Sequence, residues 1–310
     1  MFSAENLISV GIAALLTAGL YAIMSYGLAI IYGVMKVINL SHAGFLMLGA
    51  FLALVYFQRW HLDPVLGAFV NLPIFFAAGW IVHRLLVRRV VTALPIASLL
   101  LLFGLWLVLQ NLALAVWGGE DQSIITAYTY KALSVFGFRI PVTRLIVFGV
   151  ALVVLSILHF ALGHTYLGKA LRATVQDPVA GLLVGIDTEQ INAMAFGLGT
   201  AFAGLAGGLL TLLFSFNPDF GGTFQLKSFT IIVLGGLENL AGVTVGAAIL
   251  AFAESYAVLF MRASLQNVIA YALLVVALIV MPGGVAQLLS RRRNLLGRRR
   301  PATLDQQRRS

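Results

Sequence analysis

The run LISVGIAALLTAGLYAIMSYGLAIIY occupies residues 7–32 and contains no charged residue. A membrane-spanning helix needs roughly 20 apolar residues in succession, and this run exceeds that length. It is also longer than the apolar core of a cleavable signal peptide, about 7–15 residues, and no basic residue precedes it. The stretch therefore predicts a transmembrane helix close to the amino terminus.

The rest of the chain has the same character, with 61% hydrophobic residues, 10% charged residues and a mean hydropathy of +0.99. Soluble domains are about half apolar and a quarter charged, so lipid is the solvent that suits this surface. The further apolar runs cover residues 37–57, 64–82, 91–117, 141–162, 191–216, 242–260 and 268–289. With a short or broken helix after residue 224, they predict an all-α, polytopic transmembrane bundle of about eight full spans plus one short helix.

Basic residues predict the orientation. Residues 291–310 hold eight Arg and one Asp, a net +7 of the chain's +9, and this tail favours contact with anionic lipid head groups over nucleic acid. The loops with Arg84 and with Lys169 are basic as well, which predicts a cytoplasmic carboxyl terminus and a periplasmic amino terminus. We expect a transmembrane permease domain over 1–290, with 163–190 as a cytoplasmic loop, and a basic cytoplasmic tail over 291–310.

No chemistry-bearing motif indicates an enzyme, a metal site or a cofactor. The chain has no cysteine, and its five histidines lack the spacing of a metal site. The run GHTYLGKA at 163–170 nearly spells a nucleotide-binding loop, but Ala170 stands where Ser or Thr must hold magnesium, and a membrane helix precedes it instead of a strand. If ATP drives the protein, another subunit must bind it.

Two polar interruptions break apolar runs, one early and one late. The early one contains Asn39, Ser41 and His42, and the late one contains Gly235 and Gly236. Such interruptions in corresponding places of two halves predict an inverted repeat and a translocation pathway between the halves. The alternative is that both are loops at the cytoplasmic surface, because irregular backbone at membrane depth must be covered by protein or water.

Glu254 lies inside the span 242–260, where a carboxylate is costly and must face the bundle interior or a polar cavity. It is a candidate for the translocation pathway. The alternative, which we favour, is a hydrogen bond that packs two helices together. Small residues four apart predict close helix packing nearby, at Gly204 with Gly208 and Gly242 with Gly246.

The loop at 163–190 is patterned like a pair of short helices. Lys169, Arg172 and Gln176 share one face of the first helix. Asp177 before Pro178 is suited to cap the second, which Gly185 ends. The second helix has an apolar side formed by Val179, Leu182, Leu183 and Ile186. A cytoplasmic helix pair with an apolar face predicts docking into a groove of another protein.

Three segments together resemble the branched-chain amino acid ABC transporter permease family. They are YGVMKVINLSHAG at 32–44, the loop from Gly168 to Ile186, and VLGGLENLAGVTVG at 233–246. The three segments occur in the family's order along the chain, and together with the helix spacing they extend the resemblance over nearly the whole chain. The departures are Ala43 after the histidine, Pro178, and Gly181 where the family commonly has alanine; they concern the substrate rather than the permease assignment.

This resemblance implies an inner-membrane permease subunit that moves a small branched-chain amino acid, driven by ATP that partner subunits hydrolyse. The expected partners are two ABC ATPase subunits, a second permease subunit, a periplasmic substrate-binding protein and membrane lipid. The resemblance assigns ATPase coupling to residues in the loop, namely Gly168, Lys169, Arg172, Ala173, Asp177 and Gly185. Two alternatives stay open: an importer of urea or a short amide, and an ion-coupled secondary transporter.

Overall fold

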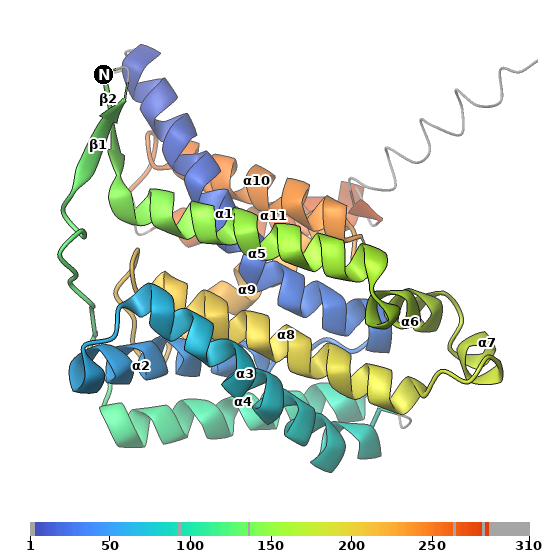
Figure 1. Ribbon diagram of the computed structural model, residues 1–310. Helices are drawn as coiled ribbons and strands as arrows, with labels where there is room; N and C mark the ends of the chain where they lie inside the picture. The colour runs from blue at the N-terminus through green and yellow to red at the C-terminus, as the bar shows by residue number, and fades with distance from the viewer. Residues whose placement is uncertain are drawn as a thin grey trace, which may run out of the picture.

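The computed structural model describes residues 4–91, 95–135, 137–237, 239–262, 265–280 and 283–284, which form an almost wholly helical bundle (Figure 1). The predicted basic tail, 291–310, lies outside the described residues. The helices are α1 (Ala4–Met35), α2 (His42–Trp60), α3 (Pro64–Leu85), η1 (Val87–Arg89), α4 (Pro95–Trp117), α5 (Val142–His164), α6 (Tyr166–Gln176), α7 (Pro178–Leu183), α8 (Thr188–Leu210), α9 (Phe220–Gly235), α10 (Leu240–Ala257) and α11 (Gln266–Val280).

Seven of the described helices are long and apolar enough to cross a membrane: α1, α2, α3, α4, α5, α8 and α10. The helix α9 has only 16 residues and is the short helix that the sequence predicts after residue 224. The helix α11, with 15 described residues, starts the last predicted span, whose end at residue 289 lies outside the described part. The prediction of an all-α polytopic bundle is confirmed.

Short polar side chains set where several helices begin. Asp63 accepts a hydrogen bond from the amide of Val65 and precedes Pro64 at the first position of α3. Asp187 caps α8 in the same way, through the amide of Gln190. A carboxylate at this place satisfies an amide that has no partner inside the helix, and proline there lacks an amide to leave unsatisfied.

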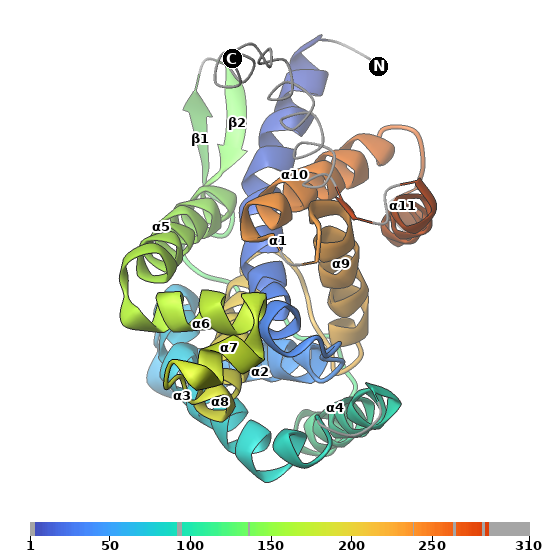
Figure 2. The same cartoon turned by 90° about the vertical axis from the view of Figure 1, so that its right-hand side faces the viewer.

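The bundle has two distinct ends. At one end lies the antiparallel hairpin of β1 (Ala132–Val135) and β2 (Phe138–Pro141), and we call this the hairpin end. At the other end lie α6 and α7, which face the viewer in Figure 2, and we call this the α7 end. Because α1 runs from the hairpin end to the α7 end and α8 runs back, the two central helices are antiparallel (Figure 1).

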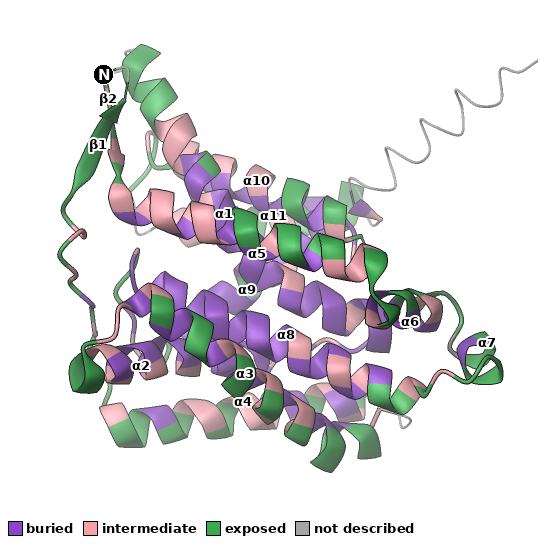
Figure 3. Ribbon diagram, in the orientation of Figure 1, coloured by how far each residue is buried: buried purple, intermediate pink, exposed green. Residues whose placement is uncertain are grey.

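The helices α1 and α8 cross in close contact at the centre of the bundle. A Cβ on Gly27 would lie against the carbonyl oxygen of Gly199, and a Cβ on Gly199 would lie against that of Gly27. Around this crossing, α8 is buried or half-buried from Ile191 to Leu210, whereas α4, α5 and α11 turn apolar side chains outward (Figure 3). Small residues let the backbones touch where lipid offers no hydrophobic drive for association.

The bundle consists of two inverted halves. The first half consists of the central helix α1, then α2 after an irregular segment, then α3, which packs on α8, and the peripheral helix α4. The second half repeats this order with α8, α9, α10, which packs on α1, and α11. The predicted inverted repeat is therefore present. The irregular segments of the two halves are 36–41 and 211–219. The sequence suggested that the late interruption at 234–239 is the counterpart of the early one, and this prediction is wrong.

Candidate functional site

The segment between α1 and α2, residues 36–41, turns back into the bundle. Lys36 has a positive φ of 55°, and Asn39, Ser41 and His42 are fully buried. The Nε2 atom of His42 donates to the carbonyl oxygen of Met24 at 2.9 Å. That carbonyl precedes the end of α1 by three helical turns, about 16 Å. The segment is thus re-entrant, and the alternative of a surface loop is wrong here.

Hydrogen bonds join this segment to α9. The hydroxyl of Ser41 donates to Oδ1 of Asn39 at 2.6 Å. The Nε2 atom of Gln225 donates to the carbonyl oxygen of Asn39 at 3.0 Å, across 186 positions of sequence. We call Asn39, Ser41, His42 and Gln225 the re-entrant cluster. Sequence reasoning missed Gln225, whose signal was a short polar run with Lys227 and Ser228 inside a predicted span region.

Several polar atoms in and near the re-entrant cluster are buried without a hydrogen-bond partner among the described residues. They are Nδ2 of Asn39, Nδ1 of His42 and Oε1 of Gln225, together with the hydroxyls of Ser25 on α1 and Ser228 on α9. A buried polar group left unpaired costs about 1–3 kcal/mol. Both donors and acceptors are therefore available inside the bundle for a polar solute.

Glu254 on α10 forms a buried ion pair with Lys227 on α9. The Nζ atom of Lys227 lies 3.0 Å from the carboxylate, and both side chains are more than nine-tenths buried. The hydroxyl of Tyr21 on α1 donates to the same carboxylate, and Nε2 of Gln266 lies 3.4 Å from it. The favoured interpretation of Glu254 as a group that packs helices together agrees with this geometry. Sequence reasoning missed Lys227.

Gly235 and Gly236 shape the turn between α9 and α10. A Cβ on Gly235 would overlap the backbone of Gly242, and a Cβ on Gly246 would overlap the carbonyl of Ile231. Gly236 has φ 102°, which favours glycine. These residues let two helices pack in direct contact. They make no hydrogen bond to the re-entrant cluster among the described residues, so a place in the pathway stays a prediction for them.

The loop at 163–190 folds as the sequence predicts. Asp177 caps α7 by accepting from the amides of Val179 and Ala180 at 2.9 and 3.0 Å, and Gly185 has φ 81° after its end. Gly168 sits so close to the backbone of Leu162 that a side chain would not fit. Ala173 is half-buried, and its carbonyl accepts from the amide of Asp177.

Much of α7 is exposed at its end of the bundle (Figure 3), and several of the exposed side chains in and directly after it are apolar. Their relative exposures are 67% for Val179, 57% for Leu182, 84% for Leu183 and 75% for Val184. We call these four residues the α7 knob. Ile186, which the sequence placed on the same face, is only half exposed and packs against the core. Apolar groups gathered at a helix end beyond the spans indicate a surface for a protein partner.

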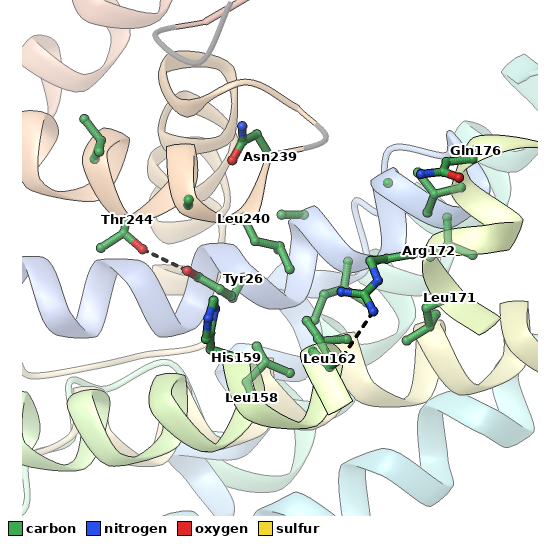
Figure 4. Close-up of a pocket in the computed structure, with 18 residues that line it drawn as sticks. Tyr26, Leu158, His159, Leu162, Leu171, Arg172, Gln176, Asn239, Leu240 and Thr244 are labelled. Atoms are coloured by element: carbon green, nitrogen blue, oxygen red, sulfur yellow. Dashed lines mark hydrogen bonds between the residues drawn. The ribbon is translucent and has the colours of Figure 1, made fainter. Parts of the chain in front are cut away.

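A groove of about 720 Å³ lies beside α6, between α1, α5 and α10 (Figure 4). Arg172 and Gln176 line it, and Arg172 donates to the carbonyl oxygen of Gly163 at 3.3 Å. Lys169 does not line it. The three residues predicted to share one polar face of α6 are all exposed, and two of them line the groove.

Comparison with known proteins agrees with this fold. Residues 11–278 match the family described as branched-chain amino acid transport system, permease component. The chain belongs to this family. The permease protein LivH of Escherichia coli K12, from the high-affinity branched-chain amino acid transport system, is 27% identical over 278 residues, 86% of this chain and 90% of LivH. No solved structure is significantly similar.

Two further relatives have comparable likeness. BraD of Pseudomonas aeruginosa, a high-affinity branched-chain amino acid permease protein, is 28% identical over 86% of this chain and 91% of BraD. A probable LivH of Methanocaldococcus jannaschii is 25% identical over 88% of this chain and 90% of that protein. The matches confirm the family predicted from three motifs.

As a member of the branched-chain amino acid permease family, the chain is a multi-pass inner-membrane transport protein and not an enzyme. The matched region includes the re-entrant cluster, the buried ion pair and the α7 knob. Within the described residues no three His, Cys, Asp or Glu side chains gather as metal ligands. The roles of individual residues in transport stay predictions.

Proposed function

We propose that this permease is the membrane subunit of an importer that moves a branched-chain amino acid inward, driven by ATPase subunits docked on the α7 knob. The α7 knob is the observation that carries the proposal. Leu183 is 84% exposed at the end of a helix that Asp177 holds in place. The chain has no nucleotide-binding loop of its own, so in an ATP-driven importer the force arrives through contact with a motor protein.

The α7 end faces the cytoplasm in this proposal. Arg88 and Arg89 on η1 and Lys169 and Arg172 on α6 lie at that end, and Gly284, which contacts Gly236 there, leads toward the basic tail. Lys and Arg accumulate on the cytoplasmic side of bacterial membrane proteins. ATP is available only on that side, which agrees with the placement of the α7 knob.

Labelling of introduced cysteines tests this orientation. The natural chain has no cysteine, so a single substitution gives one reactive thiol. We expect Tyr130→Cys at the hairpin end to react with a membrane-impermeant thiol reagent in intact spheroplasts. Lys169→Cys at the α7 end is expected to react only after the membrane is opened. The reverse pattern would refute the importer assignment.

Leu183→Asp is expected to release the ATPase partners. Burying a leucine side chain stabilises a contact by about 1.5–3 kcal/mol, so losing it weakens binding roughly ten- to a hundredfold. The measurement is the amount of ABC ATPase, identified by mass spectrometry and by ATP hydrolysis, that co-purifies with the full chain from its native membrane. Tyr130→Asp is the matched control, because Tyr130 is 83% exposed at the opposite end. Equal co-purification with both variants would contradict the docking site.

The re-entrant cluster is the proposed contact for the polar part of the substrate. Asn39→Ala removes an amide whose Nδ2 has no partner among the described residues and whose Oδ1 accepts from Ser41, while the backbone carbonyl that Gln225 binds is kept. We expect substrate uptake in native membranes to fall about tenfold, the effect of one polar contact of about 1.4 kcal/mol. Uptake is compared at equal amounts of assembled permease. A parallel loss of uptake and of assembled protein would instead show a purely structural role.

A further inference from the structure

The groove beside α6 has apolar walls and a polar mouth (Figure 4). Its walls come from four helices, and among the apolar residues that line them are Ile30, Val34, Leu158, Leu162, Leu171 and Leu240. At the mouth lie Arg172 and Gln176 from α6 and Asn239 at the start of α10. At the other end, the hydroxyls of Tyr26 and Thr244 are hydrogen-bonded at 2.8 Å. The groove is thus polar at both ends and apolar along the walls between them, and at the far end the two hydroxyls already bind each other.

The dimensions of the groove suit a chain molecule better than a helix. Along α1 the lining runs from Tyr26 to Val34, a rise of eight positions and about 12 Å of helix. A membrane-spanning helix of a second protein is about 30 Å long, so the groove would cover less than half of it. Ile157 and Phe160 on α5, each 63% exposed, flank the groove on the outer face of the bundle. The groove therefore adjoins the part of the surface that contacts lipid.

Arg172 supplies a cation without a carboxylate partner in the described part of the chain. Its guanidinium group donates to the carbonyl oxygen of Gly163 at 3.3 Å, and no described acidic side chain lies within 4.0 Å. Guanidinium groups bind phosphate through two parallel hydrogen bonds. Arg172 stands where the apolar groove meets the end of the bundle, and lipid head groups are expected at the ends of the spans.

We propose that this groove binds one anionic phospholipid. An acyl chain lies along α1 between α5 and α10, and the phosphate binds Arg172 with help from the amides of Gln176 and Asn239. The lipid then fills the space between α6 and the start of α10. Because α6 leads directly into α7, a bound lipid stabilises the position of the α7 knob relative to the spans. This site is distinct from the re-entrant cluster and does not depend on the direction of transport.

Thermal unfolding in detergent, with either phosphatidylglycerol or phosphatidylcholine added, tests the proposal, and native mass spectrometry counts bound lipids. We expect phosphatidylglycerol alone to raise the unfolding temperature and to bind one per chain. Arg172→Gln is expected to weaken that binding about tenfold or more, the value of one charge-assisted hydrogen bond. Lys169→Gln removes the same charge from the same helix outside the groove and is expected to bind as the natural chain does.

Gly33→Leu blocks the groove without touching its charge. Gly33 lines the groove, and a Cβ there would meet no atom within 4 Å, so the fold is expected to tolerate the leucine. We expect this variant to elute as a monodisperse folded protein and to lose phosphatidylglycerol binding. Three outcomes would overturn the proposal: equal binding of both lipids, equal effects of Arg172→Gln and Lys169→Gln, or the same stabilisation by inorganic phosphate. Cross-linking of Ala241→Cys to a second permease chain would overturn it as well.

Discussion

Replacing Lys227 with methionine is expected to destabilise the bundle severely, because Glu254 is then left as a buried charge without its cation. Removing one partner of a buried ion pair typically costs about 3–5 kcal/mol. For a chain of this size the unfolding midpoint in detergent is expected to fall by about 10 °C. Glu254→Met is expected to have a similar effect, since it leaves the Nζ cation of Lys227 buried and unpaired.

The double variant Lys227→Met with Glu254→Met is the informative control. Replacing both members of a buried pair by apolar groups is often nearly neutral. The double variant is therefore expected to be more stable than either single variant. A double variant as unstable as the worse single one would show that each charge has its own independent role.

The same pair of variants separates two classes of transporter. If Glu254 carried a coupling ion, as in a secondary transporter, uptake lost in Glu254→Met would stay lost in the double variant. If the carboxylate only holds α9 and α10 to α1, the double variant recovers uptake together with stability. Recovered stability without uptake would favour ion coupling.

Gly199→Leu is the second large effect that we expect, and it acts through packing alone. A Cβ at this position would lie under 3 Å from the side chain of Ile31 and from the carbonyl oxygen of Gly27. Overpacking a core usually costs about 1–3 kcal/mol and more where backbone blocks relaxation. Because Gly27 presents backbone, α1 and α8 must separate, and most of the protein is expected to be lost as aggregate.

Gly149→Leu on α5 is the matched control for this prediction. A Cβ on Gly149 would meet no atom within 4 Å. We expect this variant to give a folded yield close to that of the natural chain, measured as the monodisperse fraction after solubilisation. Equal yields of Gly199→Leu and Gly149→Leu would mean that the central helices do not cross in direct contact.

Local features of the fold were predictable from sequence, because their causes lie within a few residues. Apolar runs indicated the spans, since lipid demands apolar side chains over the length of a helix. Asp177 and Gly185 marked the limits of α7, since capping acts within one turn. The exposed leucines of α7 followed from the same pattern.

Contacts between distant segments were not predictable. The sequence singled out Glu254 but not Lys227, and Asn39 but not Gln225. Both missed residues lie in the polar run of α9, Gln225 to Thr230, and no local pattern tells which of its side chains meet distant segments. The role of Arg172 in ATPase coupling stays a prediction, but that its side chain lines the groove was not predictable, because the rotation of α6 depends on packing against α1 and α5.

By itself, the sequence determined that this protein is a multi-span helical permease with an apolar knob between its fifth and sixth spans. Hydropathy and helix capping are local properties, and they act alike in any arrangement of the helices. Only the tertiary structure decided that residues 36–41 re-enter the bundle, that Glu254 meets Lys227, and that α6 borders a groove. These features depend on how helices far apart in the chain pack together, as α1 and α8 do at Gly27 and Gly199.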